Sequence, residues 1–237
     1  MKISVCVAAY NGSEYIREQI MSILESLDSA DIVEFELLVS DDGSTDDTLD
    51  VVRSIKDCRI KILQGPRNGL IKNFEFLLYR SVGEHIFLSD QDDVWTQEKV
   101  EKCLQYLVSY DLVVSDAVVV NKDLCVMHDS LFELNGSGAG FYKNLLSNTY
   151  VGCCMCFRRK VFIDVGCLPF PRNVPMHDWW IGLLFERKAN VVFIDDKLVL
   201  YRRHENNASG TGRKSNASLA TRGKWRANLI GYILKRM

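Results

Sequence analysis

The sequence of 237 residues has no run of 18 apolar residues, so we expect no helix that spans a membrane. We also expect no secretion leader, since the strand-like stretch ISVCVAA already begins at Ile3. No glycine-rich phosphate loop follows this stretch, where the chain reads AAYNGSEY. The later GSGAG is not a dinucleotide fingerprint, because no strand runs directly into it. These absences argue against a membrane-spanning protein, a secreted protein and a nucleotide site built on a glycine-rich loop.

Eight cysteines are present, and the sequence argues against both disulfides and structural zinc as their purpose. They stand at positions 6, 58, 103, 125, 153, 154, 156 and 167. Most lie within apolar runs of a chain long enough to form its own core, which favours free, buried thiols. The CCMC cluster has no second cysteine or histidine pair at the spacing that structural zinc requires.

The charge is distributed unevenly along the chain. From Arg202 to Met237 there are nine lysines and arginines and one glutamate, which gives a net charge of +8. The whole chain carries −2, so the preceding 201 residues carry −10. Apolar residues in this basic tail recur at roughly helical spacing: Leu219, Trp225, Leu229, Ile230, Ile233 and Leu234. The pattern predicts either a helix at an anionic membrane surface or a helix packed on the parent domain.

The rest of the chain alternates between strand-like and helix-like segments. Strands are predicted over 3–9, 34–40, 58–65, 84–89 and 111–120. Helices are predicted over 14–27, 47–56, 68–81 and 96–110, with Ser13 and Thr96 as N-caps of the first and the last. This alternation indicates an α/β fold in which a mostly parallel sheet carries helices on both faces.

Polar clusters follow three of these strands: YN the first, DDGS the second and DQDD the fourth. Ligands of parallel sheets bind beyond the carboxyl ends of the strands, so we expect the clusters to meet at one rim. Asp90, Asp92 and Asp93 would repel each other there unless a cation lay between them. Oxygen ligands suit Mg²⁺ or Mn²⁺, which also bridge to phosphate. The alternative is that Asp92 or Asp93 only caps the helix predicted over 96–110.

Six segments, in order along the chain, resemble the family 2 glycosyltransferases, which are inverting enzymes with a GT-A fold. The segments are ISVCVAAYNGSEYI, LLVSDDGSTDDT, FLSDQDDVW, YVGCCMCFRRKVF, MHDWWIGLL and YRRHENNASG. The SDQDDVW motif is most similar to that of rhamnosyltransferase-type members, which build bacterial surface polysaccharides. The resemblance spans about residues 3 to 210. It implies a GT-A-type, Rossmann-like, mostly parallel sheet flanked by helices.

The resemblance implies a GT-A domain over 1–210, with a nucleotide-binding half over 1–110 and an acceptor-binding half over 111–210, followed by the basic tail over 211–237. It implies transfer of a sugar from a UDP- or dTDP-sugar to a hydroxyl of a lipid-linked oligosaccharide, in O-antigen or capsule synthesis. The protein would be cytoplasmic, peripheral at the inner face of the plasma membrane, with no nucleic acid partner. The alternatives are a sugar-nucleotide nucleotidyltransferase, which would need the missing glycine-rich loop, and a nucleotide-sugar-binding module without catalysis.

The resemblance assigns the nucleotide to residues at the ends of the first two strands. Ala8, Tyr10 and Asp42 match the family positions that hold it, and Asp41 stands beside them. The tyrosine ring could stack on a pyrimidine, and a carboxylate could accept a hydrogen bond from the ring N–H. The alternative for the two aspartates is an Asx turn with the following glycine. Lys72 could reach a phosphate or could lie on a solvated helix face.

The resemblance assigns the metal ion, Mn²⁺ or Mg²⁺, to the DxD element within SDQDD. Asp92 would ligate the metal, and Asp90 would contact the ribose, or the metal through water. His204 follows a strand-like stretch from which a family histidine can return to the metal or the diphosphate. Arg202 or Arg203 could offset phosphate charge, but strand alternation lets only one of them face the site.

The MHDWW segment supplies the expected catalytic base. Asp178 matches the family's catalytic aspartate, although a carboxylate at a probable helix start could also serve as a cap. One of Trp179 and Trp180 could form an apolar wall for the acceptor or the sugar, and the other would belong to the core. His177 could help to orient the site.

Overall fold

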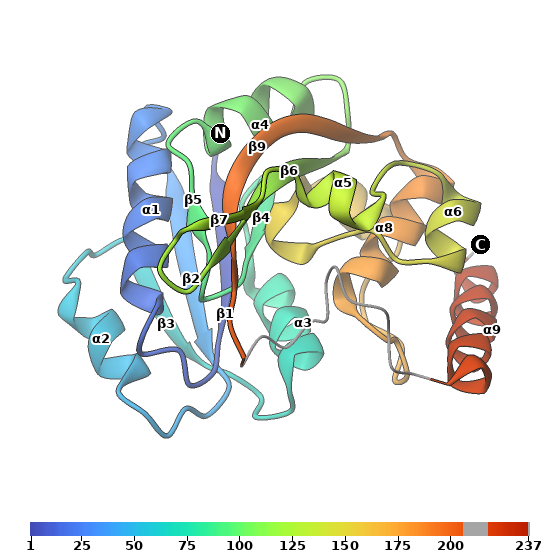
Figure 1. Ribbon diagram of the computed structural model, residues 1–237, viewed down its shortest axis with the longest axis horizontal. Helices are drawn as coiled ribbons and strands as arrows, with labels where there is room; N and C mark the ends of the chain where they lie inside the picture. Colours follow the sequence, from blue (N-terminus) through green and yellow to red (C-terminus); the bar gives the residue numbers. More distant parts are fainter. Residues whose placement is uncertain (206–217, 237) are drawn as a thin grey trace.

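The computed structural model describes residues 1–205 and 218–236, and it forms a curved mixed sheet flanked by helices (Figure 1). The strands are β1 (Ile3–Ala9), β2 (Phe35–Asp41), β3 (Ile60–Gln64), β4 (His85–Ser89), β5 (Val94–Trp95), β6 (Leu112–Asn121), β7 (Val126–His128), β8 (Met155–Arg158) and β9 (Val191–Arg203). The helices are α1 (Ile16–Ser29), α2 (Thr48–Ser54), α3 (Leu70–Arg80), α4 (Lys99–Leu107), α5 (Leu131–Asn135), α6 (Phe141–Leu146), α7 (Arg159–Asp164), α8 (His177–Lys188) and α9 (Leu219–Lys235), with a 3-10 turn, η1 (Gly152–Cys154). All the strands and helices predicted before residue 121 are present, with boundaries shifted by up to three residues.

The first half of the sheet is parallel, as predicted. Strand β1 pairs with β2 on one side and with β4 on the other, and β2 pairs with β3. Every residue of β1 and β2 is buried, which is typical of parallel strands covered by helices. Helix α3 packs on β1, and α1 packs against α2 and α4. The carboxyl ends of β1, β2 and β4 therefore lie side by side.

The second half departs from the simple alternation. Strand β8 runs antiparallel between β4 and β6, while β6 and β9 are parallel, and the short β5 pairs with β9. Strand β6 has an irregularity next to Asp116. The CCMC cluster is divided between η1 and β8.

Two predicted helix caps are wrong, and so is one alternative. Helix α1 has Tyr15 as its N-cap and α4 has Glu98, and neither cap side chain makes a capping hydrogen bond. Ser13 instead donates its backbone N–H to the Asp46 carboxylate, 3.0 Å away, and belongs to the loop before α1. Because α4 begins only at Lys99, the aspartates of SDQDD do not cap it.

The cysteines are free, as predicted: six are buried, and Cys58 and Cys125 are exposed. Among the residues that the structure describes, no helix combines the length and the apolar character needed to cross a membrane. Within the basic tail, residues 219–235 form α9, which lies beside α6 at the right of Figure 1. It packs on the domain through the buried Leu229 and Ile233, and Arg226 donates to the Leu146 carbonyl. One side of the tail helix thus packs on the parent domain.

Candidate functional site

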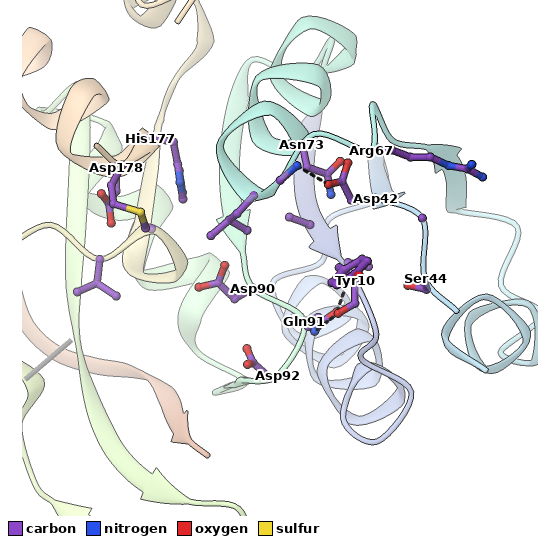
Figure 2. Close-up of a pocket in the computed structure, with 18 of the residues that line it drawn as sticks. Tyr10, Asp42, Ser44, Arg67, Asn73, Asp90, Gln91, Asp92, His177 and Asp178 are labelled. Carbon is purple, nitrogen blue, oxygen red and sulfur yellow. Dashed lines mark hydrogen bonds between the residues drawn. The ribbon is translucent and has the colours of Figure 1, made fainter. Parts of the chain in front are cut away.

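A cavity of about 740 Å³ opens beyond the carboxyl ends of β1, β2 and β4 (Figure 2). Its lining comes from strand ends and helix starts on both halves of the fold: Ala8, Ala9, Tyr10, Asp42, Gly43, Ser44, Thr45, Arg67, Gly69, Leu70, Asn73, Asp90, Gln91, Asp92, Val151, Gly152, Met176, His177, Asp178 and Tyr201. Four of the carboxylates singled out from the sequence thus share one cavity. The polar clusters after the first, second and fourth strands meet at one rim, as the parallel order requires.

The paired aspartates after β2 have different surroundings. The Asp41 carboxylate accepts the backbone N–H groups of Gly43 and Ser44, each at 3.1 Å, and forms the expected turn. Asp42 lines the cavity and accepts the Gly69 N–H at 2.7 Å, just before α3. Gly69 has a φ of 82°, a conformation that favours glycine. Asp41 therefore shapes the loop, whereas Asp42 joins that loop to α3 and faces the cavity.

The glutamine within DQDD joins two of the strand ends. The Gln91 side chain accepts the Tyr10 N–H at 2.8 Å and donates to the Tyr10 carbonyl at 3.0 Å (Figure 2). A Cβ at Gly12 would lie 2.2 Å from the Gln91 side-chain oxygen, so glycine is needed beside this contact. Tyr10 lines the cavity and remains 56% exposed. Sequence reasoning did not single out Gln91, because its partner lies in another strand end.

The aspartates after β4 concentrate negative charge at the cavity. Oδ2 of Asp92 lies 2.7 Å from Nε2 of His204, which follows β9. Burial, together with the nearby carboxylates of Asp92 and Asp178, raises the pKa of Asp90 to about 8. Asp93 is fully buried, and burial with the charges of Asp92 and Asp90 raises its pKa strongly as well. Carboxylates held so close, without a cation, disfavour each other's ionisation.

This donor set fits a hard divalent cation. Asp90 and Asp92 offer carboxylate oxygens on the cavity wall, and His204 offers an imidazole beside them. A second group brings ligand atoms of Asp90, Asp93 and Cys153 within 4.8 Å of one another. Asp93 and Cys153 are buried outside the lining, and a thiol is a poor ligand for Mg²⁺ or Mn²⁺. The carboxylates on the wall are therefore the better candidate site.

Arg202 lies behind the aspartate loop, outside the cavity lining. Its Nε donates to the Asp92 carbonyl at 2.7 Å, its backbone N–H donates to the Asp93 carboxylate at 2.9 Å, and its guanidinium pairs with Glu18. Only 4% of its side chain is exposed. The arginine thus anchors the loop to β9. Lys72, likewise outside the lining, pairs with Glu75 on α3.

Asp178 lies in the first turn of α8, within the cavity. Its Oδ1 accepts the Asn148 side-chain amide at 3.1 Å and the Trp179 backbone N–H, so it does contribute to the helix start. Burial raises the pKa of Asp178 to about 6, although these hydrogen bonds oppose the rise. The indoles of Trp179 and Trp180 are buried outside the lining and donate to the carbonyls of Asn144 and Cys167.

Two further lining residues, Arg67 and Asn73, were not assigned from the sequence, and His177 was expected only to help orient the site. Arg67 lies against Gly43, and the Asn73 side chain accepts the Ser40 hydroxyl at 2.6 Å. His177 is 2% exposed and stacks on Phe74, with 4.0 Å between the ring centroids. No local pattern marks Arg67 and Asn73, because a loop arginine and a helix asparagine have many ordinary roles.

Comparison with known proteins identifies the family of this chain. The family model described as "Glycosyl transferase family 2" matches residues 4–166. The dTDP-rhamnosyl transferase RfbG of Shigella flexneri is 26% identical, over 92% of this chain and 80% of that protein. The UDP-Glc:α-D-GlcNAc-diphosphoundecaprenol β-1,3-glucosyltransferase WfaP of Escherichia coli is 27% identical, over 63% of this chain and 59% of that protein.

Solved structures show the same fold. Staphylococcus aureus TarS, residues 1–349 in complex with UDP-GlcNAc, has a TM-score of 0.74 at 21% identity, over 100% of this chain and 66% of that chain. Mycobacterium tuberculosis glucosyl-3-phosphoglycerate synthase was solved in complex with Mn²⁺, UDP and glucosyl-3-phosphoglycerate. It has a TM-score of 0.59 at 19% identity, over 99% of this chain and 79% of that chain. The GT-A-type fold that the six segments implied is confirmed.

Proposed function

Because the chain belongs to glycosyl transferase family 2, we propose that it transfers a sugar from a UDP- or dTDP-sugar to a hydroxyl of a lipid-linked oligosaccharide. One observation carries the proposal: Asp42, Asp90, Asp92 and Asp178 line a single cavity. The names of RfbG, WfaP and TarS support a nucleotide-sugar donor, and that of WfaP supports a lipid-linked acceptor. We place the reaction in the synthesis of a bacterial surface polysaccharide.

The nucleotide would bind over the ends of β1 and β2. Ala8 forms the floor, Tyr10 is placed to stack on the pyrimidine, and Asp42 can accept a hydrogen bond from the base. The first 110 residues would thus form the nucleotide-binding half, with 111–210 as the acceptor-binding half. Arg202 and Asp41 act indirectly in this proposal, because each holds a loop in place outside the lining.

Asp92, His204 and Asp90 would hold Mn²⁺ or Mg²⁺. The cation would supply positive charge for the departing diphosphate. The aspartate loop needs a fixed position for this task, and Arg202 provides it by binding the Asp92 carbonyl. Asp90 and Asp92 would then place the diphosphate on the opposite side of the cavity from Asp178.

Asp178 would act as the general base. Its ionised carboxylate takes the proton of the acceptor hydroxyl while that oxygen bonds to the anomeric carbon. The bond from that carbon to the diphosphate oxygen breaks on the other face, and the electron pair leaves with the nucleotide. One displacement of this kind inverts the anomeric configuration. Asn148 positions the carboxylate through its amide, and Trp179 packs next to it on the acceptor side.

We also propose that α9 rests on an anionic membrane, at the cytoplasmic face of the plasma membrane. The helix carries Arg222, Lys224, Arg226 and Lys235, with no acidic residue between Leu219 and Lys235. While Leu229 and Ile233 pack inward, Ile230 and Leu234 stay exposed. Basic and apolar groups together suit an anionic lipid surface. Helix α6, beside α9, supports Trp179 through the Asn144 carbonyl, so this surface adjoins the acceptor side.

The catalytic proposal is tested with purified protein, Mn²⁺ and a panel of UDP- and dTDP-sugars, by measuring nucleotide release. Asp178→Asn should lower kcat by about 10²- to 10⁴-fold, because the general base is lost, while the nucleotide still binds. EDTA should abolish activity, and added Mn²⁺ or Mg²⁺ should restore it. Asp164→Asn changes an exposed carboxylate on α7 and should leave kcat unchanged. Equal activity of Asp178→Asn and wild type would refute the proposal.

A further inference from the structure

His177 is the least satisfied polar side chain in the cavity wall. Neither of its ring nitrogens has a hydrogen-bond partner within the part of the chain that the structure describes, although the residue is 2% exposed. A buried polar group without a partner costs about 1–3 kcal/mol. The ring lines the cavity next to Asp178, opposite Asp42 and Asn73 (Figure 2). Its position suggests a partner that is a ligand.

The neighbours of the ring are an aromatic side chain and a glycine. Phe74 stacks on the ring, with 4.0 Å between centroids, and fixes its plane. On the cavity side lies Gly152, where an added Cβ would be 2.7 Å from Nε2 of His177. Any side chain at this position would therefore fill the space beside the nitrogen. With glycine, no side chain occupies that space, and both residues line the cavity.

The chemistry of the ring selects the class of partner. Burial lowers the pKa of His177 to about 3, so the imidazole is neutral at physiological pH. A neutral imidazole offers one N–H donor and one acceptor nitrogen. Hydroxyl groups, which both donate and accept, match it, whereas a diphosphate would favour a charged partner.

We propose that His177 binds a hydroxyl of the transferred sugar and so contributes to donor selection. The inference rests on the proposed function: with the diphosphate at Asp90 and Asp92 and the base at Asp178, the sugar lies between them, against His177. The residue would contact the sugar and leave the nucleotide unaffected. It would thereby determine which sugar nucleotides bind well.

The test compares sugar-free with sugar-bearing nucleotides by isothermal titration calorimetry in Mn²⁺. The probes are UDP, dTDP, UDP-glucose, UDP-N-acetylglucosamine and dTDP-L-rhamnose. His177→Phe keeps the stacking on Phe74 but removes both nitrogens. The variant should weaken binding of the sugar nucleotide that wild type binds best. The expected loss of affinity is about 3- to 10-fold, which corresponds to one hydrogen bond. UDP or dTDP alone should bind within about twofold of wild type.

The stability of the free His177→Phe protein distinguishes a ligand-binding role from a purely structural one, because loss of a structural histidine should lower the Tm. If the nitrogens await a ligand, the free His177→Phe protein should have a Tm equal to or above that of wild type, because an unsatisfied polar group is removed. His177→Gln, which can still hydrogen-bond, should recover part of the lost affinity. If the phenylalanine side chain does not fit, His177→Leu also removes both nitrogens with a smaller side chain, and the same affinities can be compared.

His85 provides a matched control. It also has a buried ring nitrogen without a partner among the described residues, but it lies at the start of β4, at the other end of the strand from Asp90. His85→Phe should leave all five affinities unchanged. An unchanged sugar-nucleotide affinity in both His177→Phe and His177→Leu, or an equal loss for UDP and UDP-sugar, would overturn the inference. Failure of wild type to bind any of the five probes would instead refute the proposed function itself.

Discussion

The environment of Asp178 sets when its carboxylate can act as a base. Burial raises its pKa to about 6, and the hydrogen bonds from Trp179, Asn148 and Gly152 hold it below the value that burial alone would give. A base with a pKa near the working pH combines adequate ionisation with a strong tendency to take a proton. The carboxylate is thus ionised at neutral pH, yet more basic than an exposed aspartate.

We predict that kcat falls below about pH 6, by roughly tenfold for each further pH unit, because protonation removes the base. Above that pH the rate should level off. Asn148→Ala removes a hydrogen bond that lowers the pKa of Asp178, so the fall should move to higher pH. Rates at saturating donor between pH 5 and pH 8 provide the measurement. A profile that is flat, or that moves to lower pH in Asn148→Ala, would contradict the assignment.

At the scale of elements, one arginine joins the aspartate loop to the last strand. Arg202 binds the Asp92 carbonyl, the Lys122 carbonyl and Glu18, and its guanidinium lies 4.7 Å from the Tyr15 ring centre. These contacts connect α1, the loop after β4, β6 and β9 around the buried guanidinium of Arg202. The loop that carries the proposed metal ligand is therefore positioned from outside the cavity.

We predict that Arg202→Met lowers the free energy of unfolding by about 2–4 kcal/mol, because two carbonyls and a carboxylate lose their charged donor. The Mn²⁺ concentration for half-maximal activity should also rise, because Asp92 loses its support. Urea unfolding and a Mn²⁺ titration measure the two effects. Arg203→Met, a neighbouring and more exposed change, should cost less than about 1 kcal/mol. Equal effects of the two variants would show that Arg202 has no special structural role.

At the scale of the whole molecule, the cavity lies where the parallel half meets the mixed half. Strands β1, β2 and β4 supply the proposed nucleotide side, while η1, α8 and β9 supply the other wall. The tail helix α9 extends the second half beside α6 (Figure 1). If α9 binds a membrane as proposed, it would hold the proposed acceptor side of the cavity near that membrane.

We predict that the full chain sediments with vesicles rich in phosphatidylglycerol and much less with phosphatidylcholine vesicles. Replacing both Lys224 and Lys235 by glutamine should weaken binding by about 5-fold for each lysine, since each contributes roughly 1 kcal/mol at such a surface. Added salt should also weaken binding. Arg53→Gln, on the distant α2, is the control for overall charge. Equal binding to both lipids would refute the membrane role of α9.

Much of the fold could be predicted because its signals are local. Apolar runs marked the parallel strands, helical spacing marked the helices between them, and polar residues began where the strands stopped. The cavity followed from these signals, since parallel strands bring their carboxyl ends together. The DD pair shows the limit of this reasoning. Asp41 and Asp42 are equivalent in the sequence, but one binds its own turn and the other α3.

The remaining features depend on contacts between distant parts of the chain. Strand β8 enters the sheet antiparallel, and Arg202 reaches a carbonyl 110 residues away. The nitrogens of the buried His177 ring find no hydrogen-bond partner among the residues that the structure describes. Local patterns tell which side chains avoid water, and so they specified the elements, their order and the acidic rim. They do not tell which partner a buried polar group meets, because that partner comes from another segment once the chain has packed. Packing therefore separated the groups that face the cavity from those that hold it together.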